Sequence, residues 1–564
     1  MAPKPPRPEL RLRSSPLYTS LVARARQVRF STLWLQLPLW LFLAPPSASA
    51  QTAAEAKALG GRVVLVLPFD NRSGQANLDW IGDSFPETMG ERLNSSGFLT
   101  ITREDRLFAL DHLGLPAGFK PTRATTIRIA QILDADFVII GNFTTQGTRI
   151  AVQAQVLRVN QLRLSPPLSD SSELSRLLDV ENALAWKSAR EIDPGFPVAQ
   201  QTFLAASAGV KLSSFENYIR GTGASTPQER TKRLQMAVGE SSTNNAAALA
   251  LGKALYTQRE YERSAATLSK IPMGDRRALE AQFYLGLARI NTAKYADAET
   301  AFKFVAGRLP LPEVVNNQGV AASRQGHDAA ALFQRAVAAD PNDAEYHYNL
   351  AVALFRRGDT AGAQREAAAA LKLRPSDTEI QELRDRLATG RITLASATSD
   401  NPDSNSFSPL ERIRRTYTEA SFRQAAFQLD QLRSLRLATL PAAEQSTQYT
   451  QQGRDYMGQG LLPEAEKEFQ AAVAADPSSF AGHAGLAQIR EQSGNAADAR
   501  AEAQTSLKLR PNVAAYLVLA RLELASNQLA ASASDVSNAL RLEPKNSAAL
   551  GMKQALEARG QSLP

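Results

Sequence analysis

The sequence predicts a multidomain protein in which a small α/β domain of order β-α-β-α-β-β precedes an all-α solenoid in two arrays. A chain of 564 residues is longer than one hydrophobic core supports. Apolar, strand-like runs gather near the start, and self-similar helical segments fill most of the chain beyond them. The predicted boundaries are a secretory signal peptide at 1–50, the α/β domain at 60–165, connecting helices at 166–214, a first array at 215–390, a linker at 391–410 and a second array at 411–564.

The first fifty residues resemble an export signal. A basic segment precedes the apolar run from Leu33 to Ala44, and small residues at Ala48 and Ala50 follow, which predicts cleavage after Ala50. The run contains Pro38 and is about twelve residues long, whereas a spanning helix needs roughly twenty. We therefore expect a periplasmic or secreted protein, with an uncleaved membrane anchor as the alternative.

Composition excludes several classes of protein. With 44% hydrophobic and 21% charged residues the chain is globular. The net charge of +8 comes mainly from the first fifty residues, because the rest holds 57 basic and 55 acidic residues. That near balance leaves no basic footprint for nucleic acid. Cysteine is absent, which excludes disulfides, cysteine-ligated zinc and a thiol nucleophile.

The α/β domain begins with a strand that we expect to be buried on both faces, from Val63 to Phe69. An amphipathic helix, strand 98–102 and helix 124–133 follow. Two strands flanking the turn 144–147 then form a hairpin, and in its second arm alternate residues from Ile150 to Val156 are apolar. Strand 63–69 runs into the turn Asp70–Gly74. This turn lacks the glycines and lysine of a phosphate loop, and Asp70 has no catalytic partner, so Asp70, Asn71 and Ser73 are predicted to hydrogen-bond the turn.

The order of these segments resembles the TolB-like N-terminal domain, and related folds occur in FlgO- and CsgG-type envelope proteins. The resemblance is carried above all by the segments VLPFDNRSG and ADFVIIGNFTTQGTRIAVQAQVLRV. The resemblance implies assembly and interaction rather than catalysis. RVNQLRLSPPLSD departs from the family's turn after the hairpin, so we expect the closing strand to be shortened or replaced, and a proline-serine loop at its place. A helix over 172–191 and a helical stretch over 199–211 complete the connecting region.

Beyond residue 215 the chain repeats itself. Leu285, Gly286, Tyr295, Ala298, Phe302 and Pro310 stand in the same frame as residues 453–477, and Pro341 and Pro375 lie 34 residues apart. The pattern resembles the tetratricopeptide repeat, which implies pairs of antiparallel helices stacked into a groove. Seven repeats begin near Ala246, Glu280, Glu313, Ala344, Ser446, Phe480 and Val513. Degenerate repeats are predicted before residue 239 and from Glu411, where Tyr417, Phe422, Ala425 and Leu429 hold repeat-like places.

The polar stretch 396–409 is predicted to be a joint between the arrays. A calcium loop is the alternative, but the alternation of ligands and the closing glutamate are missing. His112, His327, His347 and His483 lie far apart without a second ligand at a metal-binding interval, and His347 is expected to fill the core. We therefore expect no cofactor, no metal and no enzyme activity.

The repeat resemblance implies that proteins or peptides bind in the groove. Its inner wall is predicted to carry Phe283, Ile290, Asn291, Asn316, Arg324, Tyr348, Phe355, Arg356 and, in the second array, Arg454. The lysine-asparagine clamp for a C-terminal carboxylate is not visible. The sequence thus favours an exported, non-enzymatic scaffold of the bacterial cell envelope. A signalling or regulatory module is the alternative, because TolB-like domains also accompany tetratricopeptide arrays in cyclase-associated and regulatory proteins. A third alternative, a hydrolase, would need an active site that the sequence does not display.

Overall fold

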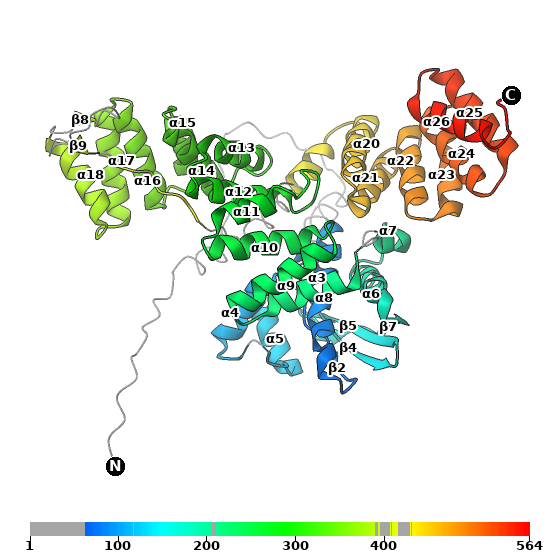
Figure 1. The fold of residues 1–564 in the computed structure, drawn as a ribbon, viewed down its shortest axis with the longest axis horizontal. Coiled ribbons are helices and arrows are strands. Elements are labelled where there is room, and N and C mark those ends of the chain that lie inside the picture. Colours follow the sequence, from blue (N-terminus) through cyan, green and yellow to red (C-terminus); the bar gives the residue numbers. More distant parts are fainter. Residues whose placement is uncertain are drawn as a thin grey trace, which may run out of the picture. The chain divides into compact units, whose positions relative to one another are not determined.

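The structure, a computed structural model, describes residues 63–116, 118–205, 210–389, 393–394, 406–407, 409–415, 429 and 431–564. The predicted signal peptide lies outside the described residues, as does most of the predicted joint at 396–409. Within the described part of the chain, no helix has the length and apolar character needed to cross a membrane. The predicted fold class is confirmed: a small mixed sheet with helices precedes arrays of helix pairs (Figure 1).

A mixed sheet forms the centre of the α/β domain. Its strand order is β3-β1-β4-β5-β6, with β2 also paired to β4 and β7 to β5. β1 runs parallel to β3 and β4, whereas β4 and β5 form an antiparallel hairpin. The strands are β1 Val63–Val66, β2 Asp70–Asn71, β3 Leu99–Thr100, β4 Phe137–Gln146, β5 Arg149–Arg158, β6 Arg163–Leu164 and β7 Leu168–Glu173.

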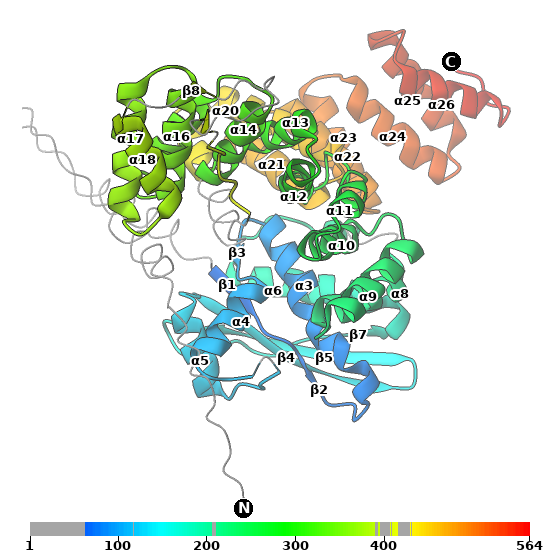
Figure 2. The same ribbon diagram turned by 60° about the vertical axis from the view of Figure 1, so that its left-hand side comes forward.

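Helices cover both faces of this sheet, which explains the continuous apolar run of β1. Val64 and Val66 pack into one hydrophobic cluster with α3 (Asp79–Ser95) and α6 (Leu177–Ile192). Leu65 and Leu67 pack into another with α4 (Arg103–His112) and α5 (Arg123–Ile132). Figure 2 shows α3 and α4 beside the sheet. The strand is buried on both faces, as predicted, but α4 was not predicted.

Two local expectations have different outcomes. Asn71 holds the turn as predicted, because the Ser73 amide donates to Asn71 Oδ1 at 3.0 Å, whereas Asp70 pairs outside the turn with Lys120 at 2.6 Å. The prediction of a proline-serine loop is wrong at Leu168–Glu173. These residues form β7, which pairs antiparallel with six residues of β5. Alternating half-buried and exposed residues leave this strand without an apolar run, so its pattern gave no strand signal.

The repeats form the predicted helix pairs. The seven pairs are α10 Asn245–Thr257 with α11 Tyr261–Leu268, α12 Ala278–Asn291 with α13 Tyr295–Ala306, α14 Pro312–Arg324 with α15 Ala330–Ala339, α16 Ala344–Arg356 with α17 Thr360–Leu373, α20 Ala442–Gly458 with α21 Leu462–Ala475, α22 Phe480–Gln492 with α23 Ala496–Leu509, and α24 Val513–Ala525 with α25 Leu529–Leu542. α7 Gln200–Ala205, α8 Leu212–Gly223 and α9 Pro227–Glu240 precede them, α18 Thr378–Thr389 follows the first four pairs, and α26 Ser547–Glu557 follows the last.

In three of the pairs a glycine of the first helix faces a phenylalanine of the second, as the repeat pattern predicts. A Cβ atom on Gly286 would lie 2.7 Å from the ring of Phe302, and one on Gly319 would lie 2.8 Å from Phe333. The same contact recurs in the second array, where Phe469 lies 2.7 Å from a Cβ on Gly453. Helices approach this closely only where one of them lacks a side chain.

The chain between the arrays departs from the prediction. Glu411 to Arg415 was predicted to begin a degenerate repeat, but these residues form neither helix nor strand. Tyr417, Phe422 and Ala425 of that predicted repeat lie outside the described residues, and Leu429 is exposed. Just before, β8 (Thr393–Leu394) pairs with β9 (Ser406–Phe407) in parallel. Residues 409–415, which we call the groove segment, lie against the first array.

Candidate peptide-binding groove

The inner wall of the first array presents asparagine side chains from α14 and α16. Asn317 and Asn349 occupy equivalent positions one repeat apart, and Asn316 precedes Asn317. All three are fully buried, and the Asn349 amide donates to Asn316 Oδ1 at 2.7 Å. Amides of this kind can both donate and accept, so they can pair with the backbone of another segment.

The groove segment is held by its backbone. The Arg412 N–H donates to Asn349 Oδ1 at 2.7 Å, and its carbonyl accepts from Asn349 Nδ2 at 2.8 Å. Asn317 repeats this arrangement at Arg414, with distances of 2.8 and 2.7 Å. Alternate residues that turn both backbone groups to one side belong to an extended chain. The wall therefore holds an extended segment of this chain through backbone groups that do not depend on its side chains.

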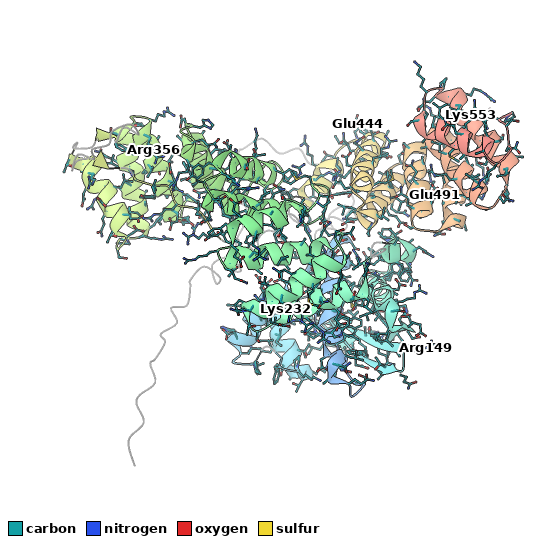
Figure 3. All side chains as sticks on the ribbon, in the orientation of Figure 1. Arg149, Lys232, Arg356, Glu444, Glu491 and Lys553 are labelled. Carbon is teal, nitrogen blue, oxygen red and sulfur yellow. The ribbon has the colours of Figure 1, made fainter. Side chains whose placement is uncertain are left out.

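A basic subsite surrounds Glu411, the residue before the first clamped position. Its carboxylate contacts Ser323 and Arg356, and its Oε2 lies 3.3 Å from Arg324 Nε. Arg356, at the end of α16 (Figure 3), also donates to the Pro409 carbonyl at 2.8 Å. Only 3% of Glu411 is exposed. A buried carboxylate with two guanidinium groups is stable only while those partners stay in place.

An acidic and aromatic subsite holds Arg412. Its guanidinium lies 4.1 Å from the Tyr348 ring centroid and binds both oxygens of Asp377 at 2.8 and 2.9 Å. Glu379 accepts a further bond at 2.6 Å. Burial alone would lower the pKa of Arg412, but the hydrogen bonds to Asp377 and Glu379 outweigh it and raise the pKa. The hydrogen bond from Arg412 lowers the pKa of Asp377 in turn.

A second, similar subsite holds Arg414. Its guanidinium pairs with Asp343 and lies 5.3 Å from the Tyr346 ring centroid. Burial lowers the pKa of Arg414, although Glu313 and Asp340 act in the opposite direction. Between the two arginines, Ile413 packs against the hydrophobic cluster of α14 and α15. The groove therefore offers one basic and two acidic subsites along a backbone clamp.

The structure brings together four of the predicted inner-wall residues, Asn316, Arg324, Tyr348 and Arg356, around the groove segment. Phe283 and Phe355 do not face it. Phe283 is fully buried beside Phe302, and Phe355 packs in the cluster of α16, α17 and α18, because an aromatic ring at these positions fills the space between helices.

Three predicted residues lie elsewhere on the repeats. Ile290 is half-buried against the clusters of α12 and α14, and the exposed Asn291 donates to the Leu287 carbonyl. Arg454 is exposed on α20. Sequence reasoning missed Asn317, Asn349 and Ser323, as well as the groove segment itself. The recurrence of asparagine at Asn317 and Asn349, at the same place in two repeats, was the available signal.

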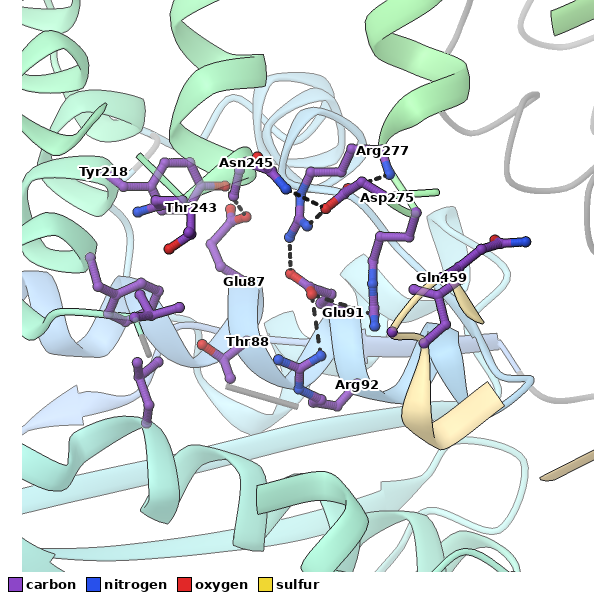
Figure 4. A pocket seen from close by; sticks show the side chains of 18 residues that line it. Glu87, Thr88, Glu91, Arg92, Tyr218, Thr243, Asn245, Asp275, Arg277 and Gln459 are labelled. Atoms are coloured by element: carbon purple, nitrogen blue, oxygen red, sulfur yellow. Dashed lines mark hydrogen bonds and ion pairs between the residues drawn. The ribbon is translucent and has the colours of Figure 1, made fainter. Parts of the chain in front are cut away.

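A second polar feature is a cavity of about 250 Å³ beside α3 and α8. Figure 4 shows its charges paired with one another: Glu91 lies between Arg92 and Arg277, and Asn245 donates to Asp275 at 2.7 Å. Burial lowers the pKa of Arg92 to about 10. These pairs join α3 to the loop before α12, so the cavity has a structural role.

Neither histidines nor acids form a metal site in the described parts of the chain. His347 and His483 instead take the same place in two repeats. The Nδ1 atom of each lies 2.6 Å from a glutamate, Glu366 or Glu502, and the Nε2 atom faces a proline carbonyl. His347 is largely buried, as predicted, but its ring is hydrogen-bonded rather than packed only in apolar surroundings.

Two family models match the helix pairs. Both are described as tetratricopeptide repeat, and they cover residues 321–387 and 450–514. The chain carries tetratricopeptide repeats. The match over 321–387 includes α16, which carries Tyr348 and Asn349 of the groove, and Asp377, which directly precedes α18.

Solved structures similar to parts of the chain include tetratricopeptide-repeat proteins. MamA, as the RS-1 ArsTM double mutant, has 18% identity and a TM-score of 0.28 over 30% of this chain and 98% of its own. YrrB, described as a TPR protein with an unusual peptide-binding site, has 14% identity and a TM-score of 0.27 over 36% and 99%. The LpoB C-terminal domain from Salmonella enterica has 20% identity and a TM-score of 0.18 over 21% and 91%. No curated protein sequence matches the chain.

Proposed function

We propose that the protein is a non-enzymatic scaffold of the bacterial cell envelope, whose first array binds an extended peptide of a protein partner. The observation that carries the proposal is the double clamp of Asn349 and Asn317 on the backbone of Arg412 and Arg414. The repeats support a role in protein–protein interaction. Each clamp pairs an N–H and a C=O that any peptide presents.

The peptide test uses the full chain with the groove segment weakened. The segment variant carries Glu411→Ala, Arg412→Ala and Arg414→Ala, which remove the side-chain contacts of the groove segment, so that a peptide with all of its contacts can replace it. A fluorescent peptide, Pro-Leu-Glu-Arg-Ile-Arg-Arg, is titrated and its anisotropy followed. We expect saturable binding that weakens at least tenfold when Asn317→Ala and Asn349→Ala are added, since four hydrogen bonds are lost at about 1 kcal/mol each. Absence of saturable binding would contradict the proposal.

Export is the second part of the proposal, and the order of basic, apolar and small residues in 1–50 supports it. A reporter enzyme that is active only outside the cytoplasm is fused to the C-terminus. We expect activity with residues 1–50 and none after their deletion. Equal activity from both fusions, or none from either, would contradict export and favour the regulatory alternative.

A further inference from the structure

We infer that the natural partner of the first array is an extended peptide with the pattern Glu-Arg-x-Arg, and that the groove segment is a built-in stand-in which this peptide displaces. The inference rests on the proposed peptide-binding function and adds the partner's chemistry and its competitor. Residues 411–414 spell Glu-Arg-Ile-Arg. The clamp bonds only backbone groups, which every peptide presents. Selectivity for a particular peptide sequence must therefore come from the three side-chain subsites.

The first subsite selects an acid. Arg356 and Arg324 converge on one carboxylate, together with the Ser323 hydroxyl. A peptide with a neutral residue there would leave two guanidinium groups without their anion in a largely buried place. A basic residue would add repulsion, so the sign of the charge at this position is fixed.

The second and third subsites select arginine. Asp377 accepts two bonds from one guanidinium, while the Tyr348 ring lies over its face. Lysine offers a point charge and cannot provide both the planar fork and the stacked face. Asp343 and Tyr346 provide a carboxylate and a ring for the second arginine, two residues on. The residue between them needs only to be apolar, as Ile413 is.

The groove segment is held by polar contacts, which makes it exchangeable. Leu410 is 54% exposed and Arg415 is exposed, so Pro409 and the half-buried Ile413 supply most of the apolar burial. Each polar contact replaces one with water, so its net contribution to holding the segment is small. A segment of a hydrophobic core could not leave, but this segment can be replaced by a peptide that makes the same contacts.

The covalent connection sets the threshold for that replacement. A tethered ligand is present at an effective concentration of about 1 mM. A free peptide with equal contacts and a dissociation constant of about 10 μM would therefore bind the wild-type chain about 100-fold more weakly than a chain whose segment is released. The natural partner overcomes this difference through further contacts or through a high local concentration.

The experiment compares two labelled peptides on two proteins. The native peptide is Pro-Leu-Glu-Arg-Ile-Arg-Arg. In the exchanged peptide the glutamate becomes arginine and the first and second arginines become glutamate, giving Pro-Leu-Arg-Glu-Ile-Glu-Arg. The proteins are the wild type and the segment variant. We expect the segment variant to bind the native peptide at least tenfold more tightly than the exchanged one, and at least tenfold more tightly than the wild type does.

The contradicting outcomes are distinct. Equal binding of both peptides by the segment variant would overturn the partner pattern and leave the proposed function standing. Equal binding of the native peptide by wild type and segment variant would overturn the stand-in. Absence of binding by the segment variant would overturn both the inference and the proposed function. If circular dichroism shows that the segment variant is unfolded, the single substitution Arg412→Ala takes its place, with the same expectations.

A second copy of the chain is the other possible occupant of the groove. In that case the groove segment of one molecule would bind in the groove of another. Light scattering of the wild type measures this. We expect a mass that is the same for the wild type and the segment variant. A dimer that the substitutions convert to a monomer would assign the groove to a second copy and overturn the stand-in.

Discussion

Asn349 holds the backbone of Arg412 through both polar atoms of its side-chain amide: Oδ1 accepts from the Arg412 N–H at 2.7 Å, and Nδ2 donates to the Arg412 carbonyl at 2.8 Å. Asn317 does the same two residues further along, at Arg414. One wall of the first array thus fixes an extended segment that belongs to the same chain.

Removing the clamps is expected to expose the groove segment to protease. In Asn317→Ala with Asn349→Ala, cleavage by trypsin after Arg412 and Arg414 should rise at least tenfold, because four hydrogen bonds worth about 1 kcal/mol each are lost. The cleavage rate is followed by mass spectrometry. Asn538→Ala on α25 is the matched control, and we expect it to cleave as the wild type does. Equal rates in all three proteins would show that the segment is not held by the amides.

Two neighbouring arginines give a matched test of the basic subsite. Arg356 contacts the buried Glu411, whereas Arg357 is 61% exposed and only reaches Asp328 at 3.8 Å. The chain has no cysteine, so Leu410→Cys can carry a single spin label. We expect Arg356→Ala to mobilise the label, because a charge-assisted contact worth about 1.5–3 kcal/mol is lost. The account fails here if Arg357→Ala mobilises the label as strongly.

The two histidine–glutamate pairs predict a pH dependence of stability. Hydrogen bonds that His347 and His483 donate to Glu366 and Glu502 raise the pKa of both histidines above 6.5, although burial opposes this. A raised pKa contributes stability that is fully present below the unfolded value of about 6.5 and is lost as the pH rises through the folded value.

The denaturation midpoint of the wild type should therefore fall as the pH rises from 6 upward, and His347→Gln with His483→Gln should show a smaller fall. Guanidinium unfolding between pH 5.5 and 9 measures this. His327→Gln, on an exposed side chain, serves as the control and should behave as the wild type does. An unchanged slope in the double variant would contradict the assignment.

The glycines of the helix pairs predict opposite signs for the same substitution. Gly286→Ala places a Cβ 2.7 Å from the Phe302 ring, so we expect a loss of about 1–3 kcal/mol. Gly239→Ala in α9 meets nothing within 4 Å and should gain about 0.5–1 kcal/mol. Shifts of the urea midpoint measure both. A gain from Gly286→Ala would show that the helices do not approach so closely.

The buried Glu181 in α6 makes a last prediction for the α/β domain. It contacts Ser84 of α3, and burial raises its pKa to about 7 from 4.5. Between these values the unfolded chain is ionised and the folded chain is not, so wild-type stability should fall as the pH rises from 4.5 to 7. Glu181→Gln should lessen this fall and be the more stable protein at pH 8. Glu191→Gln, half-buried on the same helix, is the control, and a Glu181→Gln protein less stable at pH 8 would contradict the argument.

Much of the fold could be predicted because its signals are local and repeated. Glycine opposite phenylalanine marks three of the helix pairs, and a continuous apolar run marks β1 between two layers of helices. β7 could not be predicted, because its residues carry no apolar alternation and only pairing with β5 makes them a strand.

The groove was predicted in part. Asn316, Arg324, Tyr348 and Arg356 could be placed from the repeat frame, since equivalent positions of successive first helices line one wall. Phe283 could not be told from a wall residue by spacing alone, because core and wall positions alternate on the same helix. The groove segment was beyond prediction, since its contacts join residues 409–415 to helices far earlier in the chain.

The most direct measurement of the central claim is hydrogen–deuterium exchange of the groove segment in the wild-type chain. The account predicts that the Arg412 and Arg414 amides exchange at least tenfold more slowly than in the free peptide, and that Asn317→Ala with Asn349→Ala removes the protection. Exchange of both amides at the free-peptide rate in the wild type would contradict it.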